Sequence, residues 1–117
     1  MRKYDLEGRL IDYSVSIISL TRYVKGEFAG IHLSKQLIRS GTSTALNYGE
    51  AQACESRRDF IHKMQICLKE LRETSVNLRI IQGALNMIKS DVQAILNECF
   101  ELIAIFVSSV KTAKSKL

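Results

Sequence analysis

Apolar residues recur along the chain at alternating steps of three and four, the spacing that keeps side chains on one face of an α-helix. Four such runs are separated by short polar stretches and predict helices over residues 6–25, 30–54, 57–86 and 91–115. Because the connections are only a few residues long, consecutive helices must run antiparallel. The pattern therefore predicts an all-α protein, an antiparallel up-down-up-down four-helix bundle that residues 1–117 form as one domain.

Local signals support two of the helix starts and question one helix interior. Ser56 with Asp59 three residues later resembles a capping box, and Ser90 with Gln93 has the same spacing. The second helix contains a Ser-Gly-Thr-Ser-Thr run at 40–44, which has poor helix propensity. Small residues also let a neighbouring helix approach closely, so we expect the second helix to be continuous.

The first and fourth helices are more apolar than an isolated bundle requires. The first carries a second apolar stripe beside its core stripe, and residues 102–107 are apolar around nearly the whole helix circumference. A helix that is apolar all round is usually buried all round, and here only another chain could cover the outer side. We therefore expect a homo-oligomer, although apolar residues scattered on a monomer surface are an open alternative. The candidate interface residues are Ile11, Val15, Ile18, Phe100 and Ile105.

Composition and charge narrow the class of protein. Seventeen Lys and Arg against twelve Asp and Glu give a net charge of +5, which favours nucleic acid, an acidic partner or an anionic surface. The first residues are too charged for a signal peptide, and the longest apolar run, 102–107, is far shorter than the ~20 residues that span a bilayer. We expect a cytoplasmic protein that does not associate with membranes.

The sequence contains no pattern that would indicate an enzyme. There is no nucleophile-and-base set and no glycine-rich phosphate loop. The three cysteines include no Cys-x-x-Cys pair, and neither His32 nor His62 has a glutamate three residues before it, as a di-metal bundle would require. We expect no enzymatic activity, metal, cofactor or small-molecule substrate.

Polar residues form matching stripes on the second and third helices. If these helices make a hairpin that turns near residue 55, the numbers of facing residues add to about 110. This arithmetic places Arg39 opposite Glu70, Asn47 opposite Lys63 and Gln36 opposite Thr74. We expect a polar seam that fixes the helix register, and a ligand or partner site along it is the alternative. The seam residues are Gln36, Arg39, Ser43, Asn47, Glu50, Asp59, Lys63, Glu70 and Glu73.

Another stripe on the third helix is basic and contains no acidic residue. Basic side chains along one rigid face can follow a phosphate backbone, and no interleaved aromatic residue is present to stack on bases. This stripe is the candidate nucleic-acid surface, with a simple solvated helix face as the alternative. Its residues are Arg58, His62, Gln65, Lys69, Arg72 and Arg79.

The polar seam lies within a longer pattern that resembles a known family. The chain is similar to the four-helix bundle proteins encoded in intervening sequences of bacterial 23S ribosomal RNA genes, and to the accessory protein of diversity-generating retroelements. Two departures from the family pattern are Leu46, where alanine is common, and Val76-Asn77, where many members have an aromatic pair. The resemblance rests on residues 36–43, 47–51, Ser56, Asp59-Phe60, Lys63, Leu68-Lys69-Glu70 and Glu73-Thr74.

The resemblance implies a left-handed up-down-up-down bundle that assembles into a cone-shaped homopentamer. It also implies a basic surface for RNA or DNA. The leading hypothesis is therefore an oligomeric nucleic-acid-associated module, and the second is a protein-binding adaptor or assembly scaffold without nucleic-acid affinity.

Overall fold

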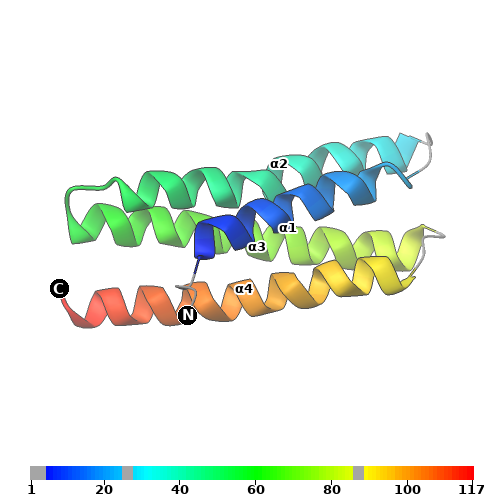
Figure 1. The fold of residues 1–117 in the computed structure, drawn as a ribbon. Helices are drawn as coiled ribbons and strands as arrows, with labels where there is room; N and C mark the ends of the chain where they lie inside the picture. Colours follow the sequence, from blue (N-terminus) through cyan, green and yellow to red (C-terminus); the bar gives the residue numbers. More distant parts are fainter. Residues whose placement is uncertain (1–4, 25–27, 86–88) are drawn as a thin grey trace.

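The computed structural model describes residues 5–24, 28–85 and 89–117, and these residues form four helices and no strand. The bundle is elongated, with dimensions of 47 × 32 × 19 Å (Figure 1). The helices are α1 (Leu6–Thr21), α2 (Phe28–Gln52), α3 (Arg57–Ala84) and α4 (Lys89–Ser115).

Each helix packs against its neighbours in the sequence, and the direction reverses at every connection (Figure 1). α1 also packs against α4, whereas α1 and α3 lie diagonally across the bundle. In Figure 1, α1 lies in front and runs from left to right, and α2 lies above it. When the view is turned so that α1 points upward, α2 lies on its left, and the bundle is therefore left-handed. The predicted all-α, up-down-up-down fold is confirmed.

The helix boundaries differ from the predicted ones at several ends. α1 ends at Thr21, four residues early, because the amides of Arg22, Tyr23 and Val24 bond three residues back and tighten the chain into a turn. α2 begins two residues early and also ends two residues early, at Gln52. The predicted end of the third helix at residue 86 lies outside the described residues.

Helix caps agree with the sequence at one predicted start and differ at the other. The Ser56 hydroxyl accepts the amide of Asp59 at 3.1 Å and caps α3, as expected. α4 begins at Lys89, so Ser90 lies inside the helix rather than at its cap. Gln93 does not complete a capping box there, because its side chain bonds with Gln82 and Asn97.

The core consists of one apolar stripe from each helix. It includes two of the three cysteines, which behave as small apolar residues. Burial raises the pKa of the Cys67 thiol to about 12 and raises the pKa of Cys99 in the same direction, so both thiols stay protonated near neutral pH. The largest fully buried side chains are Phe106, Leu10, Ile17, Leu37, Met64, Leu71, Leu78, Ile81, Leu102, Val92, Thr44 and Thr74.

α2 is continuous through residues 40–44, as expected, and its small residues lie where α1 crosses. Gly41 is buried, and a Cβ added there would collide with the side chain of Ile17. The Ser14 hydroxyl lies 3.3 Å from the Gly41 carbonyl oxygen at the same crossing. The weak helix propensity of this segment therefore accompanies a close approach of two helices.

The Gly41→Ala variant should lower the free energy of unfolding by about 1–3 kcal/mol, because the added methyl group overpacks the α1–α2 contact. Gly49→Ala is the matched control in the same helix, because a Cβ at Gly49 meets no atom within 4 Å. The control should be more stable by about 0.5–1 kcal/mol, the usual gain on replacing a helical glycine by alanine. Urea unfolding of both variants measures the change in the free energy of unfolding. Equal changes in the two variants would contradict the close approach of α1 to α2 at Gly41.

α4 contains the longest uninterrupted apolar stretch of the chain, residues 102–107. Among the described residues, Ser90–Ser115 is the one helical stretch long and apolar enough to cross a membrane by length and composition, because 18 consecutive residues within it have a mean hydropathy of 1.4. One such helix is weak evidence for a membrane span, because a core helix in a bundle meets the same criterion. Here the buried residues of α4, including Val92, Leu102 and Phe106, complete the bundle core.

Candidate nucleic-acid interface

The polar seam lies between α2 and α3 and is built on ion pairs. Arg39 is 3.4 Å from Glu70 and 3.1 Å from Glu73, so the expected pairing of Arg39 with Glu70 is present. Lys63 is 3.0 Å from Glu50. Hydrogen bonds to Glu73 and Glu50 raise the pKa values of Arg39 and Lys63, so both cations stay charged and are already partnered by carboxylates.

Two of the expected pairings in the seam are wrong. Lys63 binds Glu50 rather than Asn47, because a carboxylate is a stronger partner for a cation than a neutral amide. The Asn47 amide instead donates to the Ser43 carbonyl on its own helix at 2.9 Å. Nor does Thr74 pair with Gln36.

The hydroxyl of Thr74 is fully buried and lies 2.8 Å from that of Ser40, one helical turn along α2 from Gln36. Gln36 and Asp59 are exposed at the edges of the seam. Because Arg39 and Glu50 have side chains 61% and 60% exposed, these ion pairs fix the helix register more than they add stability.

The predicted basic stripe is continuous only over the first part of the outer face of α3, up to Arg72. Arg58, His62, Lys69 and Arg72 are all exposed there. Beyond Arg72 the same face carries apolar side chains. All five predicted nucleic-acid residues are exposed, and four of them form the continuous part of the stripe.

Arg79 lies seven residues after Arg72, on the same side of α3, and is exposed. Its guanidinium folds back along α3, where Nε donates to the carbonyl of Ser75 at 3.2 Å. The outer-face positions at this level are taken by Val76 and Ile80, which are 47% and 48% exposed. Val76 and Ile80 therefore interrupt the basic row between Arg72 and Arg79.

Two lysines of α4 lie beside the stripe, and the sequence interpretation did not assign them to it. Lys111 and Lys114 line a cavity of about 370 Å³ between α3 and α4, together with Arg72 and Gln65. Its remaining lining is apolar and comes from Leu68, Val107 and Val110. We call the surface formed by Arg72, Lys111 and Lys114 the basic groove.

The basic groove contains no acidic residue in its lining. Within the part of the chain that the structure describes, no carboxylate lies within 4.0 Å of the charged groups of Arg72, Lys111 or Lys114. The signal that could have found the two lysines is the facing-number argument applied to the third and fourth helices. A turn near residue 88 places Lys111 opposite Gln65.

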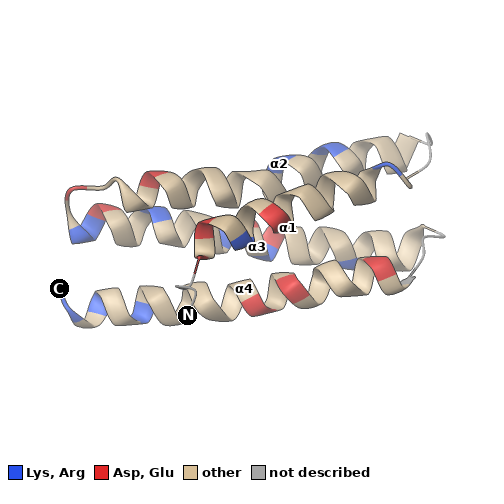
Figure 2. Ribbon diagram, in the orientation of Figure 1, with Lys and Arg blue, Asp and Glu red and all other residues tan. Residues whose placement is uncertain are grey.

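Charge is distributed unevenly along the bundle, as Figure 2 shows. Lys and Arg gather at the end where α3 begins and α4 finishes, and acidic residues occupy the middle of α4. Two of these, Glu98 and Glu101, lie 2.6 and 3.2 Å from Arg9 of α1. Arg9 is therefore paired on the α1–α4 side of the molecule, while the α3–α4 groove is left with positive charge that no acidic side chain of the same chain compensates.

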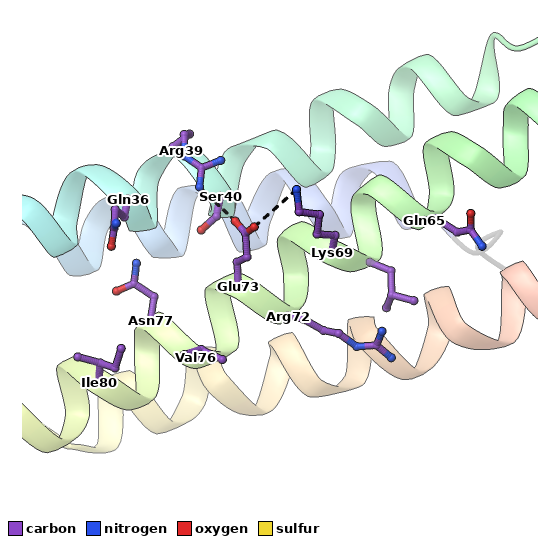
Figure 3. A pocket seen from close by; sticks show the side chains of 11 residues that line it. Gln36, Arg39, Ser40, Gln65, Lys69, Arg72, Glu73, Val76, Asn77 and Ile80 are labelled. Carbon is purple, nitrogen blue, oxygen red and sulfur yellow. Dashed lines mark hydrogen bonds and ion pairs between the residues drawn. The ribbon is translucent and has the colours of Figure 1, made fainter.

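A larger cavity of about 870 Å³ lies on the other side of the α3 ridge, between α2 and α3 (Figure 3). Val76 and Ile80 follow one another along its α3 wall, and Lys69 points toward Glu73 at 4.0 Å. Arg72 lines both this cavity and the basic groove. We call this hollow the α2–α3 cavity.

The predicted oligomer residues are not all on one surface. Ile11, Val15 and Ile18 are 50%, 56% and 40% exposed on α1, as expected. Phe100 is seven residues before Val107, on the same side of α4, and Val107 faces α3 rather than α1. Ile105 is only partly buried against the core and lines a separate cavity beneath the start of α1.

α2 also carries exposed apolar side chains. Ile38 and Leu46 are 37% and 69% exposed, three residues before and five residues after Gly41, which contacts Ser14 of α1. Within residues 5–24, 28–85 and 89–117, no three His, Cys, Asp or Glu side chains are close enough to hold a metal ion.

Comparison with known proteins identifies the family of the chain. The model of the 23S rRNA-intervening sequence protein family matches residues 3–108. The chain belongs to this family. The resemblance inferred from the seam residues is thus confirmed.

A solved structure supports the family assignment. It is the crystal structure from Bacteroides thetaiotaomicron of a protein with unknown function from the S23 ribosomal protein family. It is 31% identical, covers 92% of this chain and 99% of its own, and superposes with a TM-score of 0.84. No curated protein matches the chain.

Proposed function

We propose that this member of the family is a non-enzymatic, self-associating bundle of the cytoplasm that binds structured RNA or DNA through the basic groove. The observation that carries the proposal is the convergence of Arg72, Lys111 and Lys114 on one cavity without an acidic partner from the same chain. Cations held on two rigid helices are a suitable surface for phosphates, which need charge but not base-specific contacts. The exposed Arg58, His62 and Lys69 extend that surface along α3.

Structured nucleic acid fits this surface better than a sequence-specific single strand. Tyr48 and Phe106 are directed into the bundle, where their rings make an edge-to-face contact at 5.9 Å, and no aromatic residue lines the basic groove. Recognition of single-stranded bases relies on aromatic stacking. The family name makes ribosomal RNA the first structured polymer to test.

Self-association is supported by the apolar surface of α1 and α2. Five side chains there are between 37% and 69% exposed, and a helix face of this kind normally marks an interaction surface. The family resemblance makes five the proposed number of subunits. The same surface also favours the second candidate function, a protein-binding adaptor or scaffold without nucleic-acid affinity.

Binding isotherms at two salt concentrations separate the two candidate functions. We expect the parent protein to bind a folded ribosomal RNA fragment and a DNA duplex of equal phosphate number, with log affinity falling by about 0.7–0.9 per contact for each tenfold rise in salt. Absence of binding at 50 mM salt, or binding without a salt slope, would remove nucleic acid from the proposal and leave the scaffold.

A further inference from the structure

Two apolar helix faces on opposite sides of the molecule are left without a partner. One is the outer ridge of α1, formed by Ile11, Val15 and Ile18. The other is the outer face of α3 at Val76 and Ile80, which forms one wall of the α2–α3 cavity. Because α1 and α3 are diagonal in the bundle, one copy cannot bring these two faces together.

The two faces differ in shape, so a contact between one and the other is more complementary than a contact between two copies of the same face. The ridge of α1 is the outer side of a single helix with exposed side chains. The α2–α3 cavity is concave and about 870 Å³ in volume, with room between Gln36 on one wall and Ile80 on the other (Figure 3). A helix ridge packs into a groove more completely than onto another ridge.

The order of residues along the two helices is also complementary. On α1, the exposed Glu7 precedes the apolar ridge by one turn, and on α3 the exposed Arg72 precedes Val76 by one turn. With the two helices parallel, a constant offset of 65 residues pairs Glu7 with Arg72 and Ile11 with Val76. The same offset pairs Val15 with Ile80 and Ile18 with Gly83.

Gly83 fits its place in this register. It lies in the last turn of α3, and a Cβ built there would meet no atom within 4 Å. The surface around it therefore has room for the side chain of Ile18 from another copy. Without a side chain at residue 83, the facing helix can come closer at this level than at Val76.

We propose that the α1 ridge of one copy docks into the α2–α3 cavity of the next, with the helices parallel and Glu7 facing Arg72. The contact uses two different surfaces, so it is heterologous and propagates from copy to copy until a ring closes. An isologous contact between two α1 ridges would instead bring Glu7 near Glu7 or leave it unpaired. This docking rests on the self-association part of the proposed function.

A mixing experiment with two assembly variants tests the docking. Ile11→Asp damages only the ridge and Val76→Asp only the cavity, and both positions are about half exposed, so the fold should persist. Each variant alone should have the 13.2-kDa mass of one chain by light scattering. An equimolar mixture should give a species of twice that mass and no larger one, because one intact ridge meets one intact cavity.

Val107→Asp is the matched control, since Val107 is 41% exposed on α4 and belongs to neither face. It should keep the mass of the parent. Circular dichroism should show the parent's helix content in all three variants. Should an aspartate variant unfold, the charge reversals Glu7→Arg and Arg72→Glu replace it: each should weaken assembly at least tenfold, and the two in one chain should restore it.

The outcomes separate the docking from the self-association on which it rests. A parent of 13.2 kDa at micromolar concentration overturns both. An oligomeric parent whose Val76→Asp variant keeps the parent mass overturns the docking alone. So does a mixture that stays at the mass of one chain, because the damaged faces then cannot belong to one contact.

Discussion

Replacing Phe106 by alanine should lower the free energy of unfolding by about 3–5 kcal/mol, the cost of removing a large aromatic side chain from a closed core. Phe106 is fully buried on α4, and its ring meets that of Tyr48 on α2 at 5.9 Å and 74°. The truncation therefore leaves a cavity and removes an edge-to-face contact between two helices. Denaturant unfolding at one fixed protein concentration measures the loss, because self-association would add a concentration dependence.

Val107→Ala is the control for this substitution. Val107 is the next residue on α4, and its side chain is 41% exposed. The change should alter the free energy of unfolding by less than about 0.5 kcal/mol. If both variants lost the same small amount, Phe106 would not occupy the centre of the core.

Reversing the charges of Lys111 and Lys114 to glutamate should weaken binding to all RNA and DNA sequences alike, by about 100-fold at 50 mM salt, because each phosphate contact contributes about tenfold at that concentration. The slope of log affinity against log salt should fall by about 1.4–1.8 per protomer engaged. Both lysines are exposed at the end of α4, so the fold and the assembly should be unaffected. Fluorescence anisotropy at several salt concentrations measures both quantities.

Arg22→Glu with Lys35→Glu gives a control of equal net charge. Both residues are exposed, and they lie at the opposite end of the bundle, near the end of α1 and the start of α2. This variant should keep most of the affinity and the whole salt slope. Equal losses in the two double variants would show that net charge, rather than the basic groove, determines binding.

The helical periodicity was sufficient to predict the fold because each helix buries one face. Leu10, Leu37 and Leu71 are fully buried at positions that the spacing assigns to the core. Helix ends were less predictable, because they depend on individual hydrogen bonds. The early end of α1, for example, depends on amides after Thr21 bonding three residues back, which no residue type in that segment requires.

The candidate site was harder to predict because it combines residues from helices far apart in the sequence. The stripe on α3 could be recognised from its own spacing, but Lys111 and Lys114 join it only through the α3–α4 packing. Likewise, Phe100 and Ile11 are both exposed apolar residues, yet only the helix rotation shows that they face different sides. The sequence of one helix does not show which neighbouring helix each of its faces contacts.

The sequential packing of the four helices also has a consequence for folding kinetics. Most interhelical contacts join helices that follow one another in the chain, and the α1–α4 contact is the smallest of the four. A fold of this topology has a low contact order, and such helical domains reach the native state in microseconds to milliseconds. Since the chain contains no proline, no slow peptide-bond isomerisation at proline delays that step. Each chain should therefore complete its own fold before it meets another copy, so that the rate of assembly depends on protein concentration alone.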